Sequence, residues 1–285
     1  MSITSREVAP PEQTSTAGPP AASSDVGAAP AAIRITEVSK VYGKGPSALL
    51  ALDRVSLSVA PGEFVCLIGA SGCGKSTLLS LVAGLDAPTS GEVSTDNGGG
   101  RGNEGGRGVA LMFQESALFP WLTATRNVEL ALRASGVPRA ERRDRAAELL
   151  DAVHLGGFGG KRPHELSGGM RQRVALARAL AQKADVLLMD EPFGALDAMT
   201  RDLLHEVFER IWQERRLSVL FVTHEVREAV RLGDRVLLLS SRPGRVIEEF
   251  AVDQDRPRGM DSVQTVELAM KIKGRLREEV ARHGN

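Results

Sequence analysis

The feature that most constrains this chain is a short apolar run that leads directly into a glycine-rich loop and then into a helix. Residues 64–68 (Phe-Val-Cys-Leu-Ile) have the pattern of a strand buried on both faces of a sheet. Residues 69–76 (Gly-Ala-Ser-Gly-Cys-Gly-Lys-Ser) follow at once, and leucines at helical spacing over residues 76–83 predict a helix. The glycines let backbone N–H groups close around a polyphosphate, and the helix directs its positive end at the same charge. A strand, a loop and a helix in this order predict a phosphate-binding site.

Two side chains at the end of this loop have a chemical role in the prediction. Lys75 can bridge the β- and γ-phosphates of a nucleotide, and the hydroxyl of Ser76 can hold Mg²⁺. An incidental glycine-rich turn that contains a lysine is the alternative, and the strand and helix on either side argue against it. The predicted nucleotide-binding residues of this segment are Gly69, Ala70, Ser71, Gly72, Cys73, Gly74, Lys75, Ser76 and Thr77.

A second apolar run, residues 186–189, ends at two acidic residues. Asp190 would lie at the end of a buried strand, where its carboxylate can orient the magnesium shell. On an extended strand end, Glu191 would point in a different direction, so its carboxylate could polarise a water molecule instead of binding the metal. An exposed acidic pair after a strand is the alternative.

Composition narrows the classes of protein to which the chain can belong. It has 285 residues, 42% of them hydrophobic and 25% charged, which suits one large or two small soluble domains and excludes collagen-like, coiled-coil and fully disordered chains. Its 36 Lys and Arg residues balance 36 Asp and Glu residues, without the basic excess of most nucleic-acid binders. The two cysteines, Cys66 and Cys73, cannot build a disulfide framework or a four-ligand zinc site. The chain has no apolar run of about 18 residues and no basic-then-apolar leader, so we expect neither a membrane span nor a secretory signal.

Changes in composition along the chain suggest three parts. Residues 1–32 are rich in Ala, Pro, Ser, Thr and Gly and predict a disordered tail, with a docking arm as the alternative. Residues 33–250 alternate strand patterns with helical ones, which indicates a mainly parallel α/β sheet covered on both faces. Within them, the glycine cluster at residues 97–108 predicts a flexible surface loop or hairpin, and residues 121–165 predict helix. Residues 251–285 form an extension in which apolar side chains at near-helical spacing predict an amphipathic helix.

A third motif, residues 166–170 (Leu-Ser-Gly-Gly-Met), precedes an Ala- and Arg-rich stretch that ends at Ala181. Ser167 suits the cap of a helix and the two glycines permit close approach, so the motif predicts a helix start. A purely structural helix cap is the alternative. With this motif, the phosphate loop and the acidic pair, the chain resembles the ATP-binding subunits of ABC transporters. Met170 departs from the glutamine that usually ends this motif in the family.

The resemblance covers about residues 33–250 and implies an α/β fold. That fold is a P-loop NTPase cassette with a RecA-like core, an antiparallel β subdomain and an inserted helical subdomain at about residues 115–183. The resemblance also implies hydrolysis of ATP with Mg²⁺ in a head-to-tail homodimer with shared pockets. In such a dimer, Ser167, Gly168 and Gly169 reach the γ-phosphate of the ATP held by the second copy of the chain.

The resemblance gives roles to residues elsewhere in the sequence. Gln114 is similar to the glutamine that links the magnesium site to the helical subdomain, and Asp197 is similar to the aspartate that communicates across the dimer. His224 is similar to the histidine that contacts the γ-phosphate, and Tyr42 to the aromatic residue that stacks on adenine. Each has a plain alternative, such as a strand-end glutamine, a structural histidine or a tyrosine packed on a sheet edge. The implied catalytic residues are Glu191, His224 and Lys75, and the implied magnesium ligands are Ser76, Gln114 and Asp190.

Residues 113–122, 190–198 and 241–245 resemble the nitrate, sulfonate and taurine branch of bacterial importers. This implies separate transmembrane permease subunits, an extracytoplasmic solute-binding protein and a place on the cytoplasmic face of the inner (plasma) membrane. Aliphatic sulfonates are the first expectation for the cargo, with nitrate or taurine next. An exposed Trp121 beside Phe119 would anchor the permease, and internal packing of both is the alternative. A soluble ABC ATPase that acts on ribosomes or DNA and a nucleotide sensor without hydrolysis are the rival functions, but we expect no nucleic-acid partner because the chain lacks a basic arm.

Overall fold

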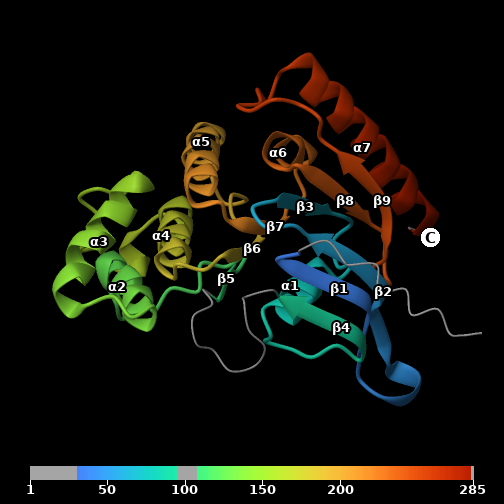
Figure 1. The fold of residues 1–285 in the computed structure, drawn as a ribbon, viewed down its shortest axis with the longest axis horizontal. Coiled ribbons are helices and arrows are strands. Elements are labelled where there is room, and N and C mark those ends of the chain that lie inside the picture. The colour runs from blue at the N-terminus through green and yellow to red at the C-terminus, as the bar shows by residue number, and fades with distance from the viewer. Residues whose placement is uncertain (1–30, 96–107, 284–285) are drawn as a thin grey trace, which may run out of the picture.

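The described part of the chain forms two β-sheets with helices around them (Figure 1). This computed structural model describes residues 31–95 and 108–283, so most of the expected tail and of the glycine cluster lies outside the described residues. The strands are β1 (Ile33–Tyr42), β2 (Leu49–Val59), β3 (Phe64–Ile68), β4 (Ser90–Thr95), β5 (Val109–Met112), β6 (Val186–Asp190), β7 (Ser218–Val222), β8 (Arg235–Leu239) and β9 (Val246–Ala251). The larger sheet has the order β5-β6-β7-β3-β8-β9, and the smaller, antiparallel sheet has the order β2-β1-β4.

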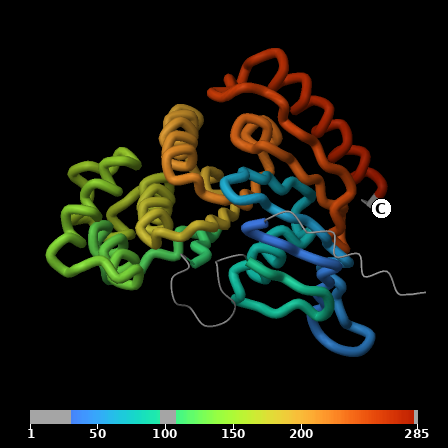
Figure 2. Tube along the Cα trace, viewed as in Figure 1, coloured from blue at the N-terminus to red at the C-terminus, as the bar shows by residue number. Residues whose placement is uncertain are grey.

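Seven α-helices and two short 3₁₀ turns complete the described part of the chain. The helices are α1 (Lys75–Val82), α2 (Ala124–Ala134), α3 (Arg139–Ala152), α4 (Gly168–Ala181), α5 (Ala198–Arg215), α6 (Val226–Leu232) and α7 (Val263–His283), and the 3₁₀ turns are Gly45–Ser47 and Pro163–Glu165. Helices α2, α3 and α4 form a group at one side of the molecule, away from the small sheet (Figures 1 and 2).

The prediction of helix over residues 121–165 is confirmed for α2 and α3 and wrong for the segments between and after them. Helices α2 and α3 are separated by a turn in which Gly136 has a φ of +74° and Pro138 directly precedes the first residue of α3. Proline has a fixed φ and no backbone N–H, so it cannot donate a hydrogen bond to the preceding helical turn. It is therefore found at the start of a helix more often than within one. After α3 the chain turns at Gly157, where φ is +83°, and no α-helix forms before Gly168.

Strand β3 lies at the centre of the larger sheet and is buried on both faces, as predicted. Successive side chains of a strand point to opposite faces. Phe64 and Cys66 therefore belong to a core shared with α5 and α6, whereas Val65 and Leu67 belong to a second core shared with α1 and the small sheet. This two-sided burial fixes the strand that carries the phosphate loop.

The order of the parallel strands places several loops at one edge of the sheet. Strands β5, β6, β7 and β3 are neighbours and run parallel, so the segments that follow them emerge side by side. Ligands of open α/β sheets bind outside the carboxyl ends of the strands. Strand β9 pairs antiparallel with β8 at the other edge, which agrees with a mainly parallel sheet.

Strand β4 was not predicted. None of its six residues is fully buried, and its sequence, Ser-Gly-Glu-Val-Ser-Thr, has too few apolar residues for a strand pattern. It forms by antiparallel pairing with β1, from Ile33 opposite Thr95 to Ser39 opposite Ser90. Its stability therefore comes from the neighbouring strand and not from a buried face of its own.

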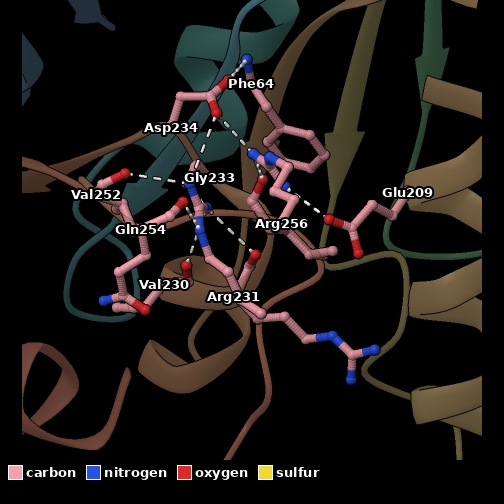
Figure 3. A network of polar contacts seen from close by, with 11 residues as sticks. Phe64, Glu209, Val230, Arg231, Gly233, Asp234, Val252, Gln254 and Arg256 are labelled. Atoms are coloured by element: carbon pink, nitrogen blue, oxygen red, sulfur yellow. Dashed lines mark hydrogen bonds and ion pairs between the residues drawn. The ribbon is translucent and has the colours of Figure 1, made fainter. Parts of the chain in front are cut away.

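The C-terminal segment is attached to the larger sheet by a network of arginine contacts (Figure 3). Arg256 donates to Glu209 of α5 at 3.1 Å and to Asp234, just before β8, at 2.7 Å. Its guanidinium also lies 4.3 Å from the ring centre of Trp212. The other carboxylate oxygen of Asp234 accepts from the backbone N–H of Phe64 at 2.9 Å, so the network reaches the first residue of β3.

Helix α7 follows this segment and is amphipathic. Ala269 and Ile272 are buried, whereas Met270, about a quarter turn from Ala269, is exposed. The helix lies beside β9, where Nε of Arg275 donates to Glu248 at 2.6 Å (Figures 1 and 2). Among the described residues, no helix combines the length and the apolar character needed to cross a membrane.

Candidate nucleotide site

The loops at the carboxyl ends of β3, β5, β6 and β7 surround a cleft of about 590 Å³. Seven of the predicted loop residues line this cleft together with Tyr42, Gln114, Glu191 and His224. Ala70 and Cys73 do not line it. The structure therefore brings together residues that are distant in the sequence and were predicted to share one site. The seven loop residues are Gly69, Ser71, Gly72, Gly74, Lys75, Ser76 and Thr77.

Glycines give the phosphate loop its shape. Gly72 and Gly74 have φ values of +74° and +107°, which residues with a Cβ rarely adopt. A Cβ on Gly74 would lie 2.6 Å from Cδ2 of Leu52 on β2 and 3.0 Å from the backbone oxygen of Ala51, so the loop or these neighbours would have to shift. The loop can keep this path only with glycine at this position.

The Lys75 ammonium is held inside the loop. The side chain is buried, and Nζ donates to the backbone oxygens of Gly69 and Ala70, both at 2.9 Å. An ammonium held only by neutral carbonyls can exchange them for a phosphate oxygen that enters the loop. Cys73 is also buried, and this burial raises the pKa of its thiol, so we expect the thiol to be unreactive.

Three oxygen-bearing side chains lie where Mg²⁺ would bind. Asp190, the last residue of β6, is buried, and this burial raises the pKa of its carboxyl, while a hydrogen bond from Ser76 opposes the shift. No group of three or more His, Cys, Asp or Glu residues in the described ranges could hold a metal. An ion at this position would depend on one carboxylate, the Ser76 hydroxyl, the Gln114 amide oxygen and phosphate oxygens. That donor set is typical of Mg²⁺, so the residues fit the ion.

Glu191 does not continue the strand, in contrast to the expectation of an extended strand end. Its φ is +45°, in the left-handed region, and its N–H donates to the carbonyl of Val222 on β7 at 2.9 Å. This turn of the backbone, and not strand alternation, separates its side chain from that of Asp190. A non-glycine residue with this conformation costs energy and is often found at functional sites.

The Glu191 carboxylate contacts two other residues of the cleft through the same oxygen. Oε2 lies 3.1 Å from Nδ1 of His224 and accepts a hydrogen bond from Nε2 of Gln114 at 3.3 Å. Among the described residues, Oε1 has no hydrogen-bond partner. The arrangement fixes the carboxylate in the cleft and leaves one oxygen available to accept a hydrogen bond from water.

Tyr42 lies at the end of β1 and lines the cleft with a side chain that is 40% exposed. Its hydroxyl donates to Asp86 at 3.1 Å, and the Nζ of Lys40 lies 4.9 Å from the ring centre. These contacts hold the ring at the mouth of the cleft, where its exposed surface can stack on a planar base.

The residues of the third motif, Ser167, Gly168 and Gly169, do not line this cleft. Ser167 caps α4 as predicted, because its hydroxyl accepts from the N–H of Met170 at 3.2 Å. Asp197 caps α5 in the same manner, with Oδ1 accepting from the N–H of Thr200 at 3.0 Å. The two caps are close in space, since a Cβ on Gly169 would lie 2.9 Å from Cδ2 of Leu196. The structure therefore joins Ser167, Gly168, Gly169 and the Asp197 loop into a second surface.

Sequence reasoning missed Arg242 as a residue of the cleft. Its Nε and Nη2 atoms donate to the backbone oxygen of Gly72 at 3.1 and 2.9 Å, and the side chain lines the cleft. The residue belongs to the 241–245 segment, which served only as a sign of the importer branch. Nothing in the spacing indicates that this segment contacts the phosphate loop.

Comparisons with known proteins agree with this geometry. The profile of the family described as ABC transporter matches residues 52–194. The nitrate import ATP-binding protein NrtD of Synechocystis sp. is 46% identical over 79% of this chain and 86% of its own length. The taurine import ATP-binding protein TauB of Burkholderia pseudomallei is 50% identical over 76% and 83%. The aliphatic sulfonates import ATP-binding protein SsuB 1 of Burkholderia cenocepacia is 46% identical over 85% and 70%.

A solved structure shows the same fold. The ATP-binding cassette MJ0796, in a dimeric post-hydrolysis state bound to ADP and Pi, superposes with a TM-score of 0.70 and 36% identity. The match covers 78% of this chain and 100% of that cassette. The expected α/β cassette fold is confirmed, and with it the binding and hydrolysis of ATP. The chain belongs to the ATP-binding proteins of the ABC transporter family.

Proposed function

We propose that this chain is the ATP-hydrolysing subunit of a bacterial ABC importer for a small oxoanion. The observation that carries the proposal is the cleft lined by Lys75, Glu191 and His224, with Asp190 directly before Glu191 at the end of β6. Three relatives that share 46 to 50% identity with the chain are described as import ATP-binding proteins. We take residues 33–250 as the cassette, about 115–183 as its helical subdomain and 251–285 as an extension.

The cleft has the groups needed to bind ATP. Backbone N–H groups of the phosphate loop and the N-terminal end of α1 face the phosphates, and Lys75 moves from the loop carbonyls to the β- and γ-phosphates. Tyr42 stacks on the adenine. Ser76, Gln114 and Asp190 would hold Mg²⁺, and the ion would supply neutralisation of phosphate charge.

Glu191 and His224 act at the γ-phosphate. Oε1 of Glu191 accepts a hydrogen bond from the attacking water, and His224 keeps Oε2 in place and contacts the γ-phosphate. The water oxygen bonds to the γ-phosphorus while the bond to the β-phosphate oxygen breaks, which releases ADP and phosphate. Stabilisation of phosphate charge by Lys75 and His224 supplies most of the rate, as in other phosphoryl transfers.

A second copy of the chain completes each pocket. Ser167, Gly168 and Gly169 do not line the cleft of their own chain, yet they begin α4 with backbone N–H groups suited to an anion. The MJ0796 cassette was solved as a dimer. In a head-to-tail dimer, these residues contact the γ-phosphate held by the partner. Asp197, which lies beside Gly169, communicates between the two pockets.

The exposed aromatic segment before α2 is the surface for the permease. Trp121 is 68% and Phe119 37% exposed, and their ring centres are 5.5 Å apart. The buried side chain of Asn127 fixes the segment, since its Oδ1 accepts from the N–H of Phe119 at 2.9 Å. Exposed aromatic residues on a fixed backbone make strong interface anchors. Separate transmembrane permease subunits would then hold the chain on the cytoplasmic face of the inner (plasma) membrane.

An extracytoplasmic solute-binding protein selects the cargo, and we propose aliphatic sulfonates as that cargo. Two of the three named relatives are import proteins for sulfonates, if taurine is counted among them for its sulfonate group. The third is an import protein for nitrate. The test is to purify the chain from native membranes, identify the permease and binding protein with it, and reconstitute all three. We expect an alkanesulfonate to stimulate ATP hydrolysis more than nitrate does. Stimulation by ribosomes or DNA, and not by any loaded binding protein, would contradict the proposal.

A further inference from the structure

His205 is a fully buried histidine on α5 that lies between the two segments carrying Glu191 and His224. On one side, its ring meets the ring of Phe193 edge to face, with centres 5.0 Å apart at 78°. Phe193 follows Glu191 by two residues. On the other side, Nε2 lies 2.7 Å from Oε1 of Glu228 on α6. The imidazole therefore contacts elements from both catalytic segments without lining the cleft itself.

Glu228 extends this contact to the residues that flank His224. Its Oε2 accepts a hydrogen bond from the hydroxyl of Thr223, which directly precedes His224. The same hydroxyl oxygen accepts from the N–H of Glu225 at 3.0 Å. The path from His205 through Glu228 to Thr223 thus holds the backbone on both sides of His224. We call these three side chains the buried relay.

All three members of the buried relay are shielded from water. Thr223 is 2% and Glu228 4% exposed, and His205 is not exposed at all. A carboxylate can only accept, so the Nε2–H of His205 donates to Glu228. Nδ1 of His205 has no hydrogen-bond partner in the described part of the chain, and Oδ1 of Asp202 lies 3.9 Å away. Buried polar atoms usually have a hydrogen-bond partner, so an unpaired ring nitrogen calls for an explanation. A positioning role for the imidazole would provide one.

We propose that His205 is a positioning residue for ATP hydrolysis, which sets the contact between Glu191 and His224 through Phe193 on one side and Glu228 on the other. This inference rests on the roles proposed for Glu191 and His224. The expected effect of its loss is on the hydrolysis step, because the side-chain hydrogen bonds of the buried relay, within the described part of the chain, reach neither the phosphate loop nor Tyr42. Binding of ATP should therefore be unchanged.

The test compares His205→Leu with His205→Gln in the full chain. Leucine fills similar space but cannot donate, whereas the glutamine amide can still donate to Glu228. We expect His205→Leu to lower kcat about tenfold, with KM and the Kd for a fluorescent ATP analogue within about twofold, because catalytic groups are misplaced while the binding groups stay in position. His205→Gln should restore most of kcat. Equal losses in both variants, or wild-type kcat in His205→Leu, would overturn the inference.

Two further variants separate positioning from stability and from the proposed catalytic roles. Ile211→Ala removes a buried side chain of α5 nearly two turns from His205, so it lowers Tm and should leave kcat unchanged. If His205→Leu does not fold, Thr223→Val replaces it in the test, because this variant removes the other donor to Glu228. It should lower kcat and leave KM unchanged. A kcat loss in Ile211→Ala equal to that of the relay variants would contradict the inference. Glu191→Gln and His224→Ala are measured beside them, and wild-type turnover in these two would instead overturn the catalytic roles.

Discussion

Nδ1 of His224 lies 3.1 Å from Oε2 of Glu191, although the two residues are 33 positions apart and follow different strands. Pairing of β6 with β7 places Asp190 opposite Val222, so the two segments leave the sheet side by side. The left-handed backbone of Glu191 then turns its carboxylate toward the histidine. A short parallel pairing therefore determines the geometry of the candidate catalytic pair.

Replacing Glu191 with glutamine should separate ATP binding from ATP hydrolysis. The amide keeps the size of the side chain and its contacts, but it is a poor base for the attacking water. We expect kcat to fall by about a hundredfold or more, with the Kd for ATP almost unchanged. Single-turnover hydrolysis and equilibrium binding measure the two effects. Glu148→Gln, on the exposed side of α3, is the matched control, and near-normal turnover in Glu191→Gln would remove the residue from its role.

Gly74→Ala should reduce ATP binding through the shape of the phosphate loop. The new Cβ would lie 2.6 Å from Leu52 and 3.0 Å from the carbonyl oxygen of Ala51, so the loop must move. We expect the Kd for ATP to rise about tenfold or more, since loop N–H groups no longer converge on the phosphates. Gly136→Ala is the control, because Gly136 also has a positive φ but nothing lies within 4 Å of an added Cβ. Equal ATP affinity in the two variants would contradict this account of the loop.

Asp190→Asn should stabilise the nucleotide-free protein and abolish magnesium-dependent hydrolysis. Burial raises the pKa of the Asp190 carboxyl, so the charged form costs folding free energy at neutral pH. As the pH falls through this raised pKa, the folded wild type takes up a proton before the unfolded chain does, and its stability rises relative to the variant. The Tm advantage of Asp190→Asn should thus be largest at neutral pH and disappear in acid. A wild type that is more stable than the variant at neutral pH would show that the carboxylate is stabilised and not strained by its site.

Trp121→Ala should leave the isolated subunit unchanged and impair its assembly with the permease. Because the side chain is 68% exposed, we expect the free energy of unfolding to change by less than about 0.5 kcal/mol. Copurification with the membrane subunits should fall strongly. Val263→Ala on α7, where the side chain is 70% exposed, is the control for a general loss of exposed apolar surface. Unchanged assembly in Trp121→Ala would place the permease surface elsewhere.

The parts of the fold that were predicted from the sequence are those with local signals. The buried run of β3, the glycine loop and the Ser167 cap each depend on residues that are adjacent in the chain. Strand β4 has no such signal, since it is stabilised by pairing with β1 across more than fifty residues of sequence separation. Its partner, and not its composition, makes it a strand.

The same limit applies to the site. Lys75 could be predicted from the glycine-rich loop and Asp190 from the apolar run that it ends. The conformation of Glu191 could not, since no residue type in that position signals a left-handed backbone. Arg242 enters the cleft only because its segment folds back onto Gly72. His205 gains its proposed role from proximity to Phe193 and Glu228, which periodicity on α5 does not show.

The claim on which the account depends most is that each working pocket combines the phosphate loop of one chain with the Ser167 helix end of another. The direct test mixes Lys75→Ala with Ser167→Arg, each inactive alone, after confirming that mixed dimers form. If pockets are shared, every mixed dimer holds one intact pocket, and an equal random mixture should recover about a quarter of wild-type ATPase activity. If each chain contains a complete site, both chains of a mixed dimer are inactive, and activity no higher than that of the parents would contradict the account.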